Sequence, residues 1–508
     1  MRLNLGCCDA ILPGYVNVDV VDGPGVDLVA DLSKPWPWPD GSIERVRAHD
    51  VIEHLPDKIH TMNELWRVLA PGGVAEVAVP TTDGTGAFQD PTHVCYSEDT
   101  EVLTTSGFAP LTRLKRGVCV LTVNPTTMVA ESVRCRDVVD LPYEGEMFHY
   151  KTKRLDLLVT PDHNLWTAYP NSRGDMRWRW KRAEETRYLT GHHTLAMRSD
   201  MVWRGKDPEV FRFSAPHRGR NRSSSLTISS RDFAEFMGWW LSEGWTHVEE
   251  GQHVYGGKRH WAYTVGIAQS DTANLDKCEI IHTMLSRIGV PFSRSGTSFV
   301  LQHKGLCLYL KRLGHADEKY IPQEVKQLPP DLLRVLLDSY ALGDGRRVGT
   351  MSERQLATVS PRLAADLQEV AIKAGYRSIV STELREGEEY CILGRTTTNC
   401  RDIHFAGVYP SKLVWVPPPK VVSYQGRVLC PVLPRHHLVL VRRNGRTVWS
   451  GNSFWNRRSF LYYEAGNVYR DRFARSYGVW AAFRVVWEHT TQTMDGPRLE
   501  IHLQAVKG

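Results

Sequence analysis

Two groups of residues that can break and remake peptide bonds stand far apart in this chain. Cys95 is one, and Asn452 followed directly by Ser453 is the other. A cysteine thiol is the best side-chain nucleophile near neutral pH, because some thiolate is present without an added strong base. Between them Thr160 and His163 form the spacing Thr-x-x-His, and a histidine there can protonate a departing amine. These residue types indicate acyl transfer between a thiol, a hydroxyl and an amide.

Two acidic residues within the same interval end matching apolar segments. Glu243 lies near the end of EFMGWWLSEGW, residues 235–245, and Asp344 near the end of LLDSYALGDGR, residues 336–346. Either acid alone would be read as a helix cap, but a repeated pair favours two closely packed helices whose carboxylates meet at one end. Paired carboxylates can hold divalent ions that activate water for phosphodiester hydrolysis, and Mg²⁺ suits such ligands. Glu243 and Asp344 are therefore predicted as metal ligands and catalytic residues.

Composition and charge set the broad class. A chain of 508 residues with 42% apolar and 24% charged residues is expected to fold into more than one domain. It has no run of 18 apolar residues and no basic start followed by an apolar stretch, so we expect a soluble cytoplasmic protein with no membrane partner. Residues 95–452 contain 49 Lys and Arg against 38 Asp and Glu, a net +11, whereas the two ends together carry −5. The basic middle segment suits a polyanion.

The chain begins with a short apolar strand that runs into a turn of small residues, Gly6 to Asp9, and a second strand ends at Asp19. Small residues at such a turn let the backbone approach a nucleotide-like ligand, and the acid can bind ribose hydroxyls. The segments that follow include Asp31-Leu32, AHDVIEHL at 48–55 and LAPGG at 69–73.

Together these segments resemble class I S-adenosylmethionine-dependent methyltransferases. The resemblance implies a Rossmann-like α/β fold that binds S-adenosylmethionine, with Gly6, Asp19 and Asp31 as contacts, and a methyl acceptor that it does not identify. Cys8 departs from the family, which usually has a second glycine there. A sheet domain without activity stays open as an alternative.

The methyltransferase-like sequence is interrupted. It stops near DPTHV, residues 90–94, and resumes at Ser453 with a predicted helix and two strands of alternating apolar residues. Joining Val94 to Ser453 gives DPTHVSFWNRRSF without a break and one domain of 150 residues. The sequence therefore predicts a single host domain divided by the segment 95–452.

The borders of this segment resemble the sequence blocks of inteins, the self-excising elements of the Hint fold. The blocks are residues 95–108, 157–166 and 428–453, in that order. The resemblance implies an all-β splicing domain that needs no cofactor. Cys95 would attack the carbonyl of the preceding residue, Ser453 would accept the acyl group, and Asn452 would cyclise to release the insert, while Thr160 and His163 assist the first step.

Three further positions bear on the last step. His437 lies seven residues after Cys430, which matches the family's Asp-to-His spacing and implies that His437 assists cyclisation of Asn452. Cys430 stands where Asp is common and could modulate the first step or relay an acyl group. His436 could exchange roles with His437, and a packing role stays open for either. Gly451 stands where many inteins have His, which predicts a slower cyclisation or a greater dependence on His437.

The two segments ending in Glu243 and Asp344 resemble the paired LAGLIDADG helices of homing endonucleases. A second repeat, Val265–Gly289 and Ala357–Gly375, predicts a strand followed by a helix each time. The resemblance implies an α+β endonuclease with double-stranded DNA as partner. Its strands would contact DNA through basic residues such as Lys258, Arg259, Arg346 and Arg347. Ser214–Asp232 is predicted to be a flexible linker, and Trp239, Trp240 and Trp245 are predicted to be packing residues.

The sequence thus predicts a multidomain precursor. Its parts are host 1–94, splicing region and linker 95–227, endonuclease 228–400, splicing region 401–452 and host 453–508. Two other readings remain: a methyltransferase whose insert binds nucleic acid without splicing, and a Hint domain that cleaves without ligation. The adjacent Asn452 and Ser453 favour ligation.

Overall fold

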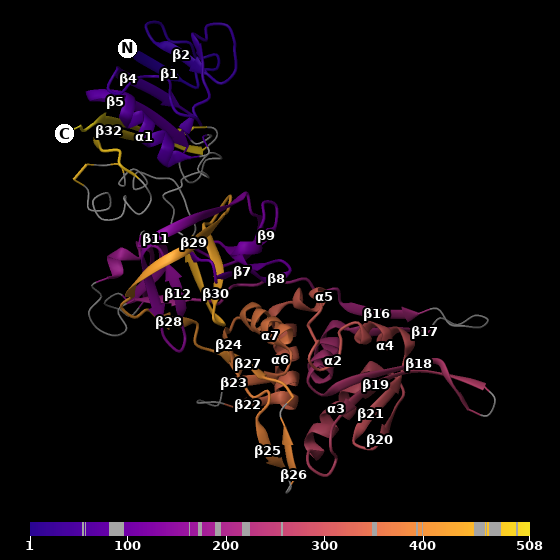
Figure 1. Cartoon of the computed structure of the whole chain (residues 1–508). Helices are drawn as coiled ribbons and strands as arrows, with labels where there is room; N and C mark the ends of the chain where they lie inside the picture. Colours follow the sequence, from indigo (N-terminus) through magenta and orange to yellow (C-terminus); the bar gives the residue numbers. More distant parts are fainter. Residues whose placement is uncertain are drawn as a thin grey trace.

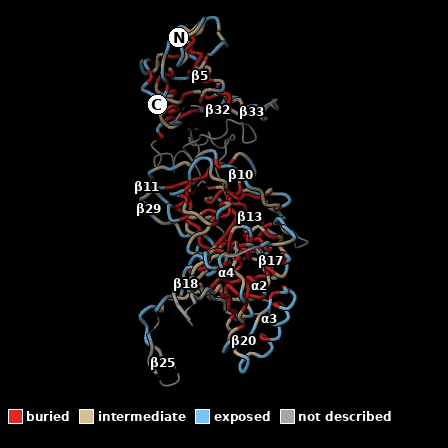
Figure 2. The backbone as a smooth tube through the Cα atoms, turned by 90° about the vertical axis from the view of Figure 1, so that its right-hand side faces the viewer, coloured by how far each residue is buried: buried red, intermediate tan, exposed pale blue. Residues whose placement is uncertain are grey.

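The computed structural model has the two chain ends in one body, a β-rich middle and a mixed α/β region beyond it (Figure 1). Buried residues fill the interior of each (Figure 2). The structure describes all residues except 53, 54, 56, 81–95, 162, 171–174, 188–194, 216–223, 256, 257, 348–352, 393, 394, 399, 452–462, 464, 467–478, 494, 495 and 508.

Both ends of the chain contribute to a seven-stranded sheet. Its order is β3-β2-β1-β4-β5-β33-β32, and β33 runs antiparallel to β5, with Arg498 opposite Pro80 and Gln504 opposite Val74. The predicted Rossmann-like sheet is present, since β1 to β5 pair in parallel in the doubly wound order. The strands are β1 (Arg2–Leu5), β2 (Val16–Asp19), β3 (Leu28–Val29), β4 (Ile43–His49), β5 (Leu69–Pro80), β32 (Phe483–Thr493) and β33 (Gly496–Ala505).

One face of this sheet is apolar and the other is polar. Leu3, Val46, Val77 and Ile501 belong to one buried cluster with residues of α1 (Lys58–Val68). Alternate positions on β4 and β33 carry charged or histidine side chains, and β5 adds Glu76 to the same face. Parallel sheets in doubly wound folds usually bury both faces. In this sheet, apolar and polar side chains instead alternate along the strands, so that one face is apolar.

The middle body is β-rich. A closed barrel is formed by β11 (Asp137–Lys151), β12 (Asp156–Val159), β6 (Tyr96–Ser97) and β29 (Lys420–Val432). Among the described residues of 96–215 there is no α-helix, only two short 3₁₀ turns, which agrees with the predicted all-β splicing region. A further sheet contains β13 (Asn164–Pro170), β14 (Met176–Arg182), β15 (Ala196–Arg198) and β28 (Leu413–Trp415).

A ten-stranded sheet continues from the middle body into the mixed region. Its path is β10-β9-β7-β30-β31-β24-β27-β23-β22, and β8 pairs with β7. The crossing point is the pair Ile379 and Arg446, with the Val380 amide donating to the Gly445 carbonyl at 2.9 Å. A Cβ on Gly445 would lie 2.1 Å from the Val380 carbonyl oxygen, so only glycine allows this approach. The strands are β7 (Glu101–Thr104), β8 (Gly107–Pro110), β9 (Cys119–Val123), β10 (Ala130–Arg134), β22 (Gly345–Arg347), β23 (Arg354–Thr358), β24 (Arg377–Glu383), β27 (Ile403–Tyr409), β30 (Leu438–Arg443) and β31 (Arg446–Gly451).

Two packed helices, α2 (Ser230–Glu243) and α6 (Pro330–Asp344), form the centre of the mixed region (Figure 1). Each predicted repeat is a strand followed by a helix: β19 then α3, and β23 then α7. The other elements are β18 (Gly244–Tyr255), β19 (Lys258–Ala268), α3 (Leu275–Ile288), β20 (Phe292–Ser295), β21 (Ser298–Gln302), α4 (Lys304–Lys311), α5 (Gln323–Lys326), α7 (Pro361–Lys373), β25 (Glu389–Ile392) and β26 (Arg395–Thr398).

The structure bears on three expectations. The predicted linker within 214–232 is wrong for its described part, because β17 (Ser224–Ser229) pairs with β16 (Val210–Ala215) and α2 follows at once. Trp239 and Trp240 are fully buried as predicted, but Trp245 is 38% exposed. β27 lies beyond the predicted endonuclease boundary at residue 400, yet it pairs with β23 and β24.

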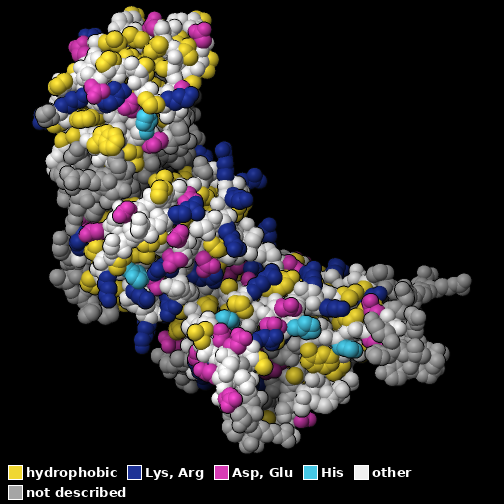
Figure 3. Space-filling view, viewed as in Figure 1, with side chains coloured by type: hydrophobic (Ala, Val, Ile, Leu, Met, Phe, Trp, Pro, Cys, Tyr) yellow, Lys and Arg dark blue, Asp and Glu magenta, His cyan; other side chains and the backbone are white. Residues whose placement is uncertain are grey.

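Two surface properties complete the fold. None of the helices in the described part of the chain is long and apolar enough to cross a membrane. Many Lys and Arg side chains lie on the visible face of the middle body (Figure 3), in keeping with the positive charge of residues 95–452.

Candidate functional site

The described residues that adjoin the two predicted splice junctions are hydrogen-bonded to each other. The Tyr96 hydroxyl donates to the Gly451 carbonyl oxygen. His163 Nε2 lies 2.9 Å from the Ser450 hydroxyl oxygen, and the rings of Tyr96 and His163 meet edge to face with centroids 4.5 Å apart. Tyr96, His163 and Ser450 have no exposed surface. Polar contacts in such a dry site are stronger than in water.

Strand register brings the remaining candidates to the same place. Leu438, which follows His437, is opposite Gly451 in the β30–β31 pair. Leu429, which precedes Cys430, is opposite Tyr96 in the β29–β6 pair. His437 and Cys430 are therefore each one residue from a strand position opposite Gly451 or Tyr96. Because consecutive Cα atoms are about 3.8 Å apart, both residues lie close to the two predicted junctions.

A buried turn between β12 and β13 holds Thr160 and His163. Neither residue has exposed surface, and the His163 amide donates to the Thr160 carbonyl at 3.1 Å. The His163 carbonyl accepts from the Ala183 amide at 2.8 Å. The turn is thus anchored on both sides and aims the imidazole at Ser450.

The two neighbouring histidines share an unusual backbone conformation and are both partly buried. His436 and His437 both have left-handed backbone conformations, with φ of 67° and 51°, which costs free energy in non-glycine residues and is common at functional sites. His436 Nε2 lies 3.2 Å from Glu131, which also pairs with Arg435. Which of the two histidines assists cyclisation stays a prediction.

Cys430 is fully buried in an apolar cluster on the barrel wall. Its cluster includes Tyr143, Met147, Leu158 and Val428. The Cys430 thiol is 3.8 Å from the Pro431 carbonyl oxygen. Cys430 thus packs in the barrel wall, and a role in the first step or in relaying an acyl group stays a prediction.

Gly451 has no room for a side chain. A Cβ there would lie 2.3 Å from the Asn164 carbonyl oxygen and 3.0 Å from Trp180 Cζ3. The first contact is with the backbone of β13, which cannot move aside as a flexible side chain could. The departure from the usual histidine at this position therefore has a steric cause.

Three predicted catalytic residues, Cys95, Asn452 and Ser453, lie outside the described residues. The same holds for the side chains of Lys258 and Arg259.

The two predicted metal-binding acids end α2 and α6 side by side. A Cβ on Gly238 of α2 would lie 2.5 Å from the Leu336 carbonyl oxygen, and one on Gly343 would lie 2.2 Å from the Ser242 hydroxyl oxygen. Glycine thus permits close packing of the helices. Burial raises the pKa of Asp344 to about 6, and the Glu243 carboxylate adds to this shift. Burial also raises the pKa of Glu243. Two adjacent, partly desolvated carboxylates form a suitable donor set for a divalent cation.

Lys319 is a functional candidate that sequence reasoning missed. Its ammonium donates to the carbonyl oxygens of Trp240, Leu241 and Gly244 at 2.9, 3.1 and 2.8 Å. Burial lowers the pKa of Lys319 to about 8, although Asp344 and then Glu243 favour its charged form. The lysine therefore caps the end of α2 and places a cation beside both acids. No periodicity or repeat in the sequence marks it.

A basic cavity of about 380 Å³ lies near the acids. Lys277, Arg346, Arg347 and Arg354 are among its lining residues. Arg346 and Arg347 are exposed on β22, and Arg346 Nε donates to the Gln355 amide oxygen at 2.7 Å. Asp338 also lines this cavity and pairs with Arg354, and Arg346 lies 3.8 Å from Glu383.

At the amino-terminal end of the host, the predicted cofactor residues surround one turn. Gly6 has φ +61°, and a Cβ there would lie 2.7 Å from a Val51 methyl group. The Cys8 amide donates to Asp19 at 2.8 Å, and Cys8 itself is left-handed with φ 44°. Asp31 accepts from the Ser33 amide and hydroxyl at 3.0 and 2.6 Å, and these bonds lower its pKa. Cys8 thus has a left-handed backbone, a conformation that glycine adopts more readily than other residues.

The family comparison identifies this part of the chain. Residues 17–77 match the family model described as a methyltransferase domain. The host part is methyltransferase-like. A probable S-adenosylmethionine-dependent methyltransferase of Mycolicibacterium smegmatis is 31% identical over 135 residues, which cover 24% of this chain and 52% of that protein.

Two other relatives carry unrelated names. The chain is 26% identical over 303 residues to the ATP-dependent Clp protease proteolytic subunit of Chlamydomonas moewusii, covering 58% of this chain and 29% of the relative. It is 25% identical over 403 residues to the DNA-directed RNA polymerase subunit beta C-terminal section of Stigeoclonium helveticum, covering 71% and 36%. The chain thus spans about a third of the length of these relatives.

Solved inteins are among the structures similar to this chain. A mutant of the Ssp DnaB mini-intein variant M86 aligns over 27% of this chain and 80% of its own, with 17% identity and a TM-score of 0.17. A complex of the Haloferax volcanii Trm112 methyltransferase activator and a methyltransferase aligns over 15% of this chain and 44% of its own, with 22% identity and a TM-score of 0.13.

The turn of the methyltransferase-like host fits a nucleotide-like cofactor. Gly6 has a left-handed backbone, and Val51 lies against the position that its Cβ would take; Asp19 lies within one hydrogen bond of the turn through Cys8. The backbone of Ala30, next to Asp31, donates to the Asp19 carbonyl at 2.8 Å. The three predicted contacts therefore share one edge of the sheet.

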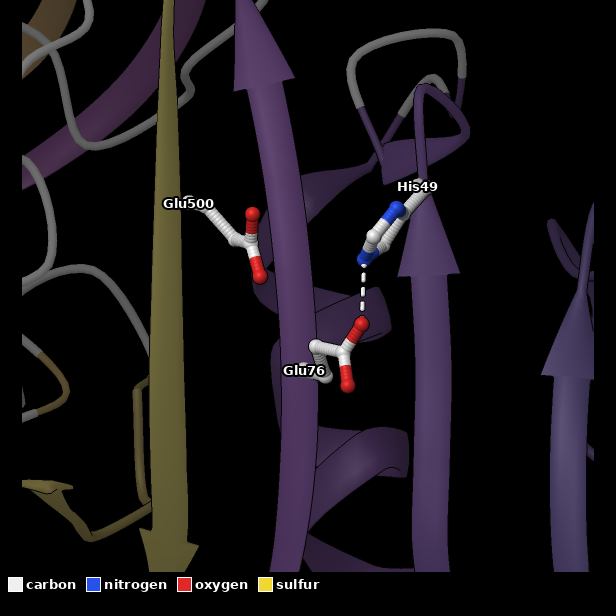
Figure 4. A group of neighbouring side chains, drawn as sticks. All are labelled: His49, Glu76 and Glu500. Atoms are coloured by element: carbon white, nitrogen blue, oxygen red, sulfur yellow. Dashed lines mark ion pairs between the residues drawn. The ribbon is translucent and has the colours of Figure 1, made fainter. Parts of the chain in front are cut away.

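A third polar group lies on the polar face of the host sheet (Figure 4). His49, Glu76 and Glu500 place ligand atoms within 4.8 Å of one another, and His49 Nε2 is 2.7 Å from Glu76. Arg47 lies 2.9 Å from His49 Nδ1, so Nδ1 is the acceptor and Nε2 carries the proton of the neutral ring. Burial, then Arg47, lowers the pKa of His49. This tautomer and the neighbouring guanidinium oppose a metal ion, and the group acts as a hydrogen-bonded charge network.

Proposed function

We propose that the chain is a precursor that splices itself, releasing residues 95–452 and joining residues 1–94 to 453–508. The observation that carries this proposal is the hydrogen bond between Tyr96 and Gly451, the neighbours of Cys95 and Asn452. The two junctions must approach each other for an acyl group to pass between them. The seven-stranded sheet adds support, because β33 and β32 pair with a sheet made by the first 80 residues.

The proposed chemistry is a sequence of acyl transfers. The Cys95 thiol attacks the Val94 carbonyl, the amide becomes a thioester, and His163 protonates the departing Cys95 amine. The Ser453 hydroxyl then attacks the thioester, which frees the thiol and leaves a branched ester. The Asn452 side-chain amide attacks its own carbonyl and expels the Ser453 amine, which finally takes the acyl group from the ester oxygen. No cofactor enters these steps.

The relatives are consistent with an insert that is independent of its host. The two longest matches are to a protease subunit and a polymerase subunit, whose named activities have nothing in common with each other or with a methyltransferase. The polymerase match covers 71% of the chain, close to the share of the segment 95–452. A similar segment carried in unrelated proteins is the expected distribution of a self-splicing element.

Intact mass spectrometry tests splicing directly. The freshly expressed wild type is compared with Cys95→Ala, Asn452→Ala and Ser453→Ala. Splicing gives a joined host of 150 residues and a released insert of 358 residues in the wild type alone. Cleavage that persists without ligation in the wild type would indicate a Hint autoprocessing domain. If the wild type and all variants stay at 57.7 kDa, the splicing proposal is wrong.

A second proposed activity is DNA cleavage by the region around α2 and α6. It is supported by the adjacent Glu243 and Asp344, the buried Lys319 ammonium and the basic cavity at β22. The two carboxylates would hold Mg²⁺, which supplies an activated water and stabilises the leaving oxygen, while Lys319 holds the end of α2. The excised insert is tested on a library of double-stranded DNA with Mg²⁺, with Asp344→Asn as the matched control. Equal cleavage by both proteins would contradict the assignment.

For the joined host we propose S-adenosylmethionine binding and methyl transfer in the cytoplasm. Gly6 and Asp19 would hold the cofactor, which supplies the methyl group. Titration calorimetry of the joined host with S-adenosylmethionine tests this, and an Asp19→Ala host that binds equally well would contradict the role of Asp19.

A further inference from the structure

Tyr96 connects three parts of the splicing centre. It follows Cys95 directly in the chain, its hydroxyl donates to the Gly451 carbonyl, and its ring packs against His163. Its backbone is fixed on both sides, because Tyr96 pairs with Val159 of β12 and with Leu429 of β29. The hydroxyl therefore extends from a rigid strand to the end of β31.

Cyclisation of Asn452 places a strict demand on the backbone before it. The side-chain nitrogen must come within about 3–3.5 Å of the carbonyl carbon of the same residue. The preceding residue, Gly451, is the most freely rotating residue type, and the steric limit at its Cβ position excludes a larger one. A hydrogen bond to the Gly451 carbonyl restricts the peptide plane that Gly451 shares with Asn452.

We infer that Tyr96 is a positioning residue for cleavage at the C-terminal junction. Its hydroxyl fixes the Gly451–Asn452 peptide so that the Asn452 amide can reach its own carbonyl. A histidine, which many inteins have at this position, has no space here. The inference rests on the proposed splicing function and adds to it a residue outside the nucleophiles and the histidines.

The test is Tyr96→Phe in the full chain. This change keeps the ring and its contact with His163 and removes only the hydroxyl. The matched control is Tyr143→Phe, because Tyr143 lies in the same barrel and its hydroxyl also donates to a backbone carbonyl, that of Glu146, at 2.8 Å. Time courses by intact mass spectrometry give the rate of hydroxylamine cleavage at the N-terminal junction and the rate of Asn452 cyclisation.

In Tyr96→Phe we expect cyclisation to slow about fivefold, the effect of about 1 kcal/mol from one lost buried hydrogen bond. Hydroxylamine cleavage should stay within about twofold of wild type, and Tyr143→Phe should leave both rates within the same limit. The ratio of the two rates in one sample is the readout, because both cleavages occur in folded molecules and misfolding lowers both alike.

Two outcomes overturn the inference: cyclisation at the wild-type rate in Tyr96→Phe, or an equal slowing of both rates, which indicates general damage to the fold. Failure of the proposed function has a different signature, since the wild type would then show neither cleavage.

Discussion

Replacing Gly451 with histidine distinguishes two expectations, one of faster and one of slower Asn452 cyclisation. Resemblance to inteins that have histidine at this position predicts that Gly451→His accelerates cyclisation. The structure predicts the reverse, because a Cβ would lie 2.3 Å from the Asn164 carbonyl oxygen, well inside the 3.4 Å of ordinary contact. β31 and β13 would have to separate by roughly 1 Å, which also displaces the Gly451 carbonyl from Tyr96.

The magnitude follows from two contributions. Overpacking of a dense interior costs about 1–3 kcal/mol, and loss of the hydrogen bond from Tyr96 adds about 1 kcal/mol. A combined effect of about 2–4 kcal/mol corresponds to a cyclisation rate lower by about 30-fold to 1,000-fold. Gly451→Ala should show the lower end of this range and Gly451→His the upper end.

The assay is a time course of intact mass for wild type, Gly451→Ala and Gly451→His, with melting temperatures of splicing-blocked chains measured in parallel. Gly23→Ala is the matched control, because the nearest atom to its added Cβ is a Val26 methyl group at 3.8 Å, an ordinary contact. The reasoning is refuted if Gly451→His splices as fast as wild type with an unchanged melting temperature.

Further predictions concern the packing of α2 against α6, the buried Lys319 and the need of the proposed DNA cleavage for divalent cations. Gly238→Val should destabilise the α2–α6 pair by about 1–3 kcal/mol in urea unfolding, since its Cβ would lie 2.5 Å from the Leu336 carbonyl oxygen. The pKa of Lys319 is about 8 in the folded chain, whereas an ordinary lysine, as in the unfolded chain, has a pKa of 10.5. Between these two pH values the unfolded chain binds more protons than the folded chain, so the free energy of unfolding should rise with pH. The rise should be about 2 kcal/mol from pH 8 to 10, measured by calorimetry, and should be absent in Lys319→Met. Chelation of divalent cations by EDTA should stop DNA cleavage and leave the splicing rate unchanged, and slower splicing would contradict the separation of the two centres.

Local apolar patterns in the sequence predicted strands and helices that pair with other regular strands and helices. Alternating apolar residues predicted the strands that became β32 and β33, and matching apolar segments predicted α2 and α6 with Glu243 and Asp344 at their ends. The serine-rich segment before α2 resembled a linker, but tertiary packing overrode composition: β17 pairs with the apolar strand β16 and lies against α2 and α4.

What the sequence could not predict depends on contacts between distant segments. Lys319 is placed by three carbonyls at the end of a helix nearly 80 residues earlier. The crowding at Gly451 comes from Asn164, and no pattern in either segment indicates the other. The sequence shows which residue types are present and how they are spaced. Which of them are in contact depends on the packing of distant strands and helices.

The shared sheet connects the stability of the mixed region around α2 and α6 to that of the proposed splicing region, because β31 pairs with β24. Lys326 pairs with Asp366 and Glu369, both at 2.9 Å, and Lys373 pairs with Glu369 at 2.6 Å. All four side chains are nearly buried, and a Cβ on Gly107 of β8 would lie 3.6 Å from Glu369 and from Lys326. Removing one member of a buried ion pair typically costs about 3–5 kcal/mol. Glu243 and Asp344 are not members of these ion pairs, whereas α7 carries Asp366, Glu369 and Lys373 and packs against β24, which pairs with β31. We therefore expect substitution of the two acids to remove the proposed DNA cleavage without slowing the proposed splicing, and loss of α7 to impair both.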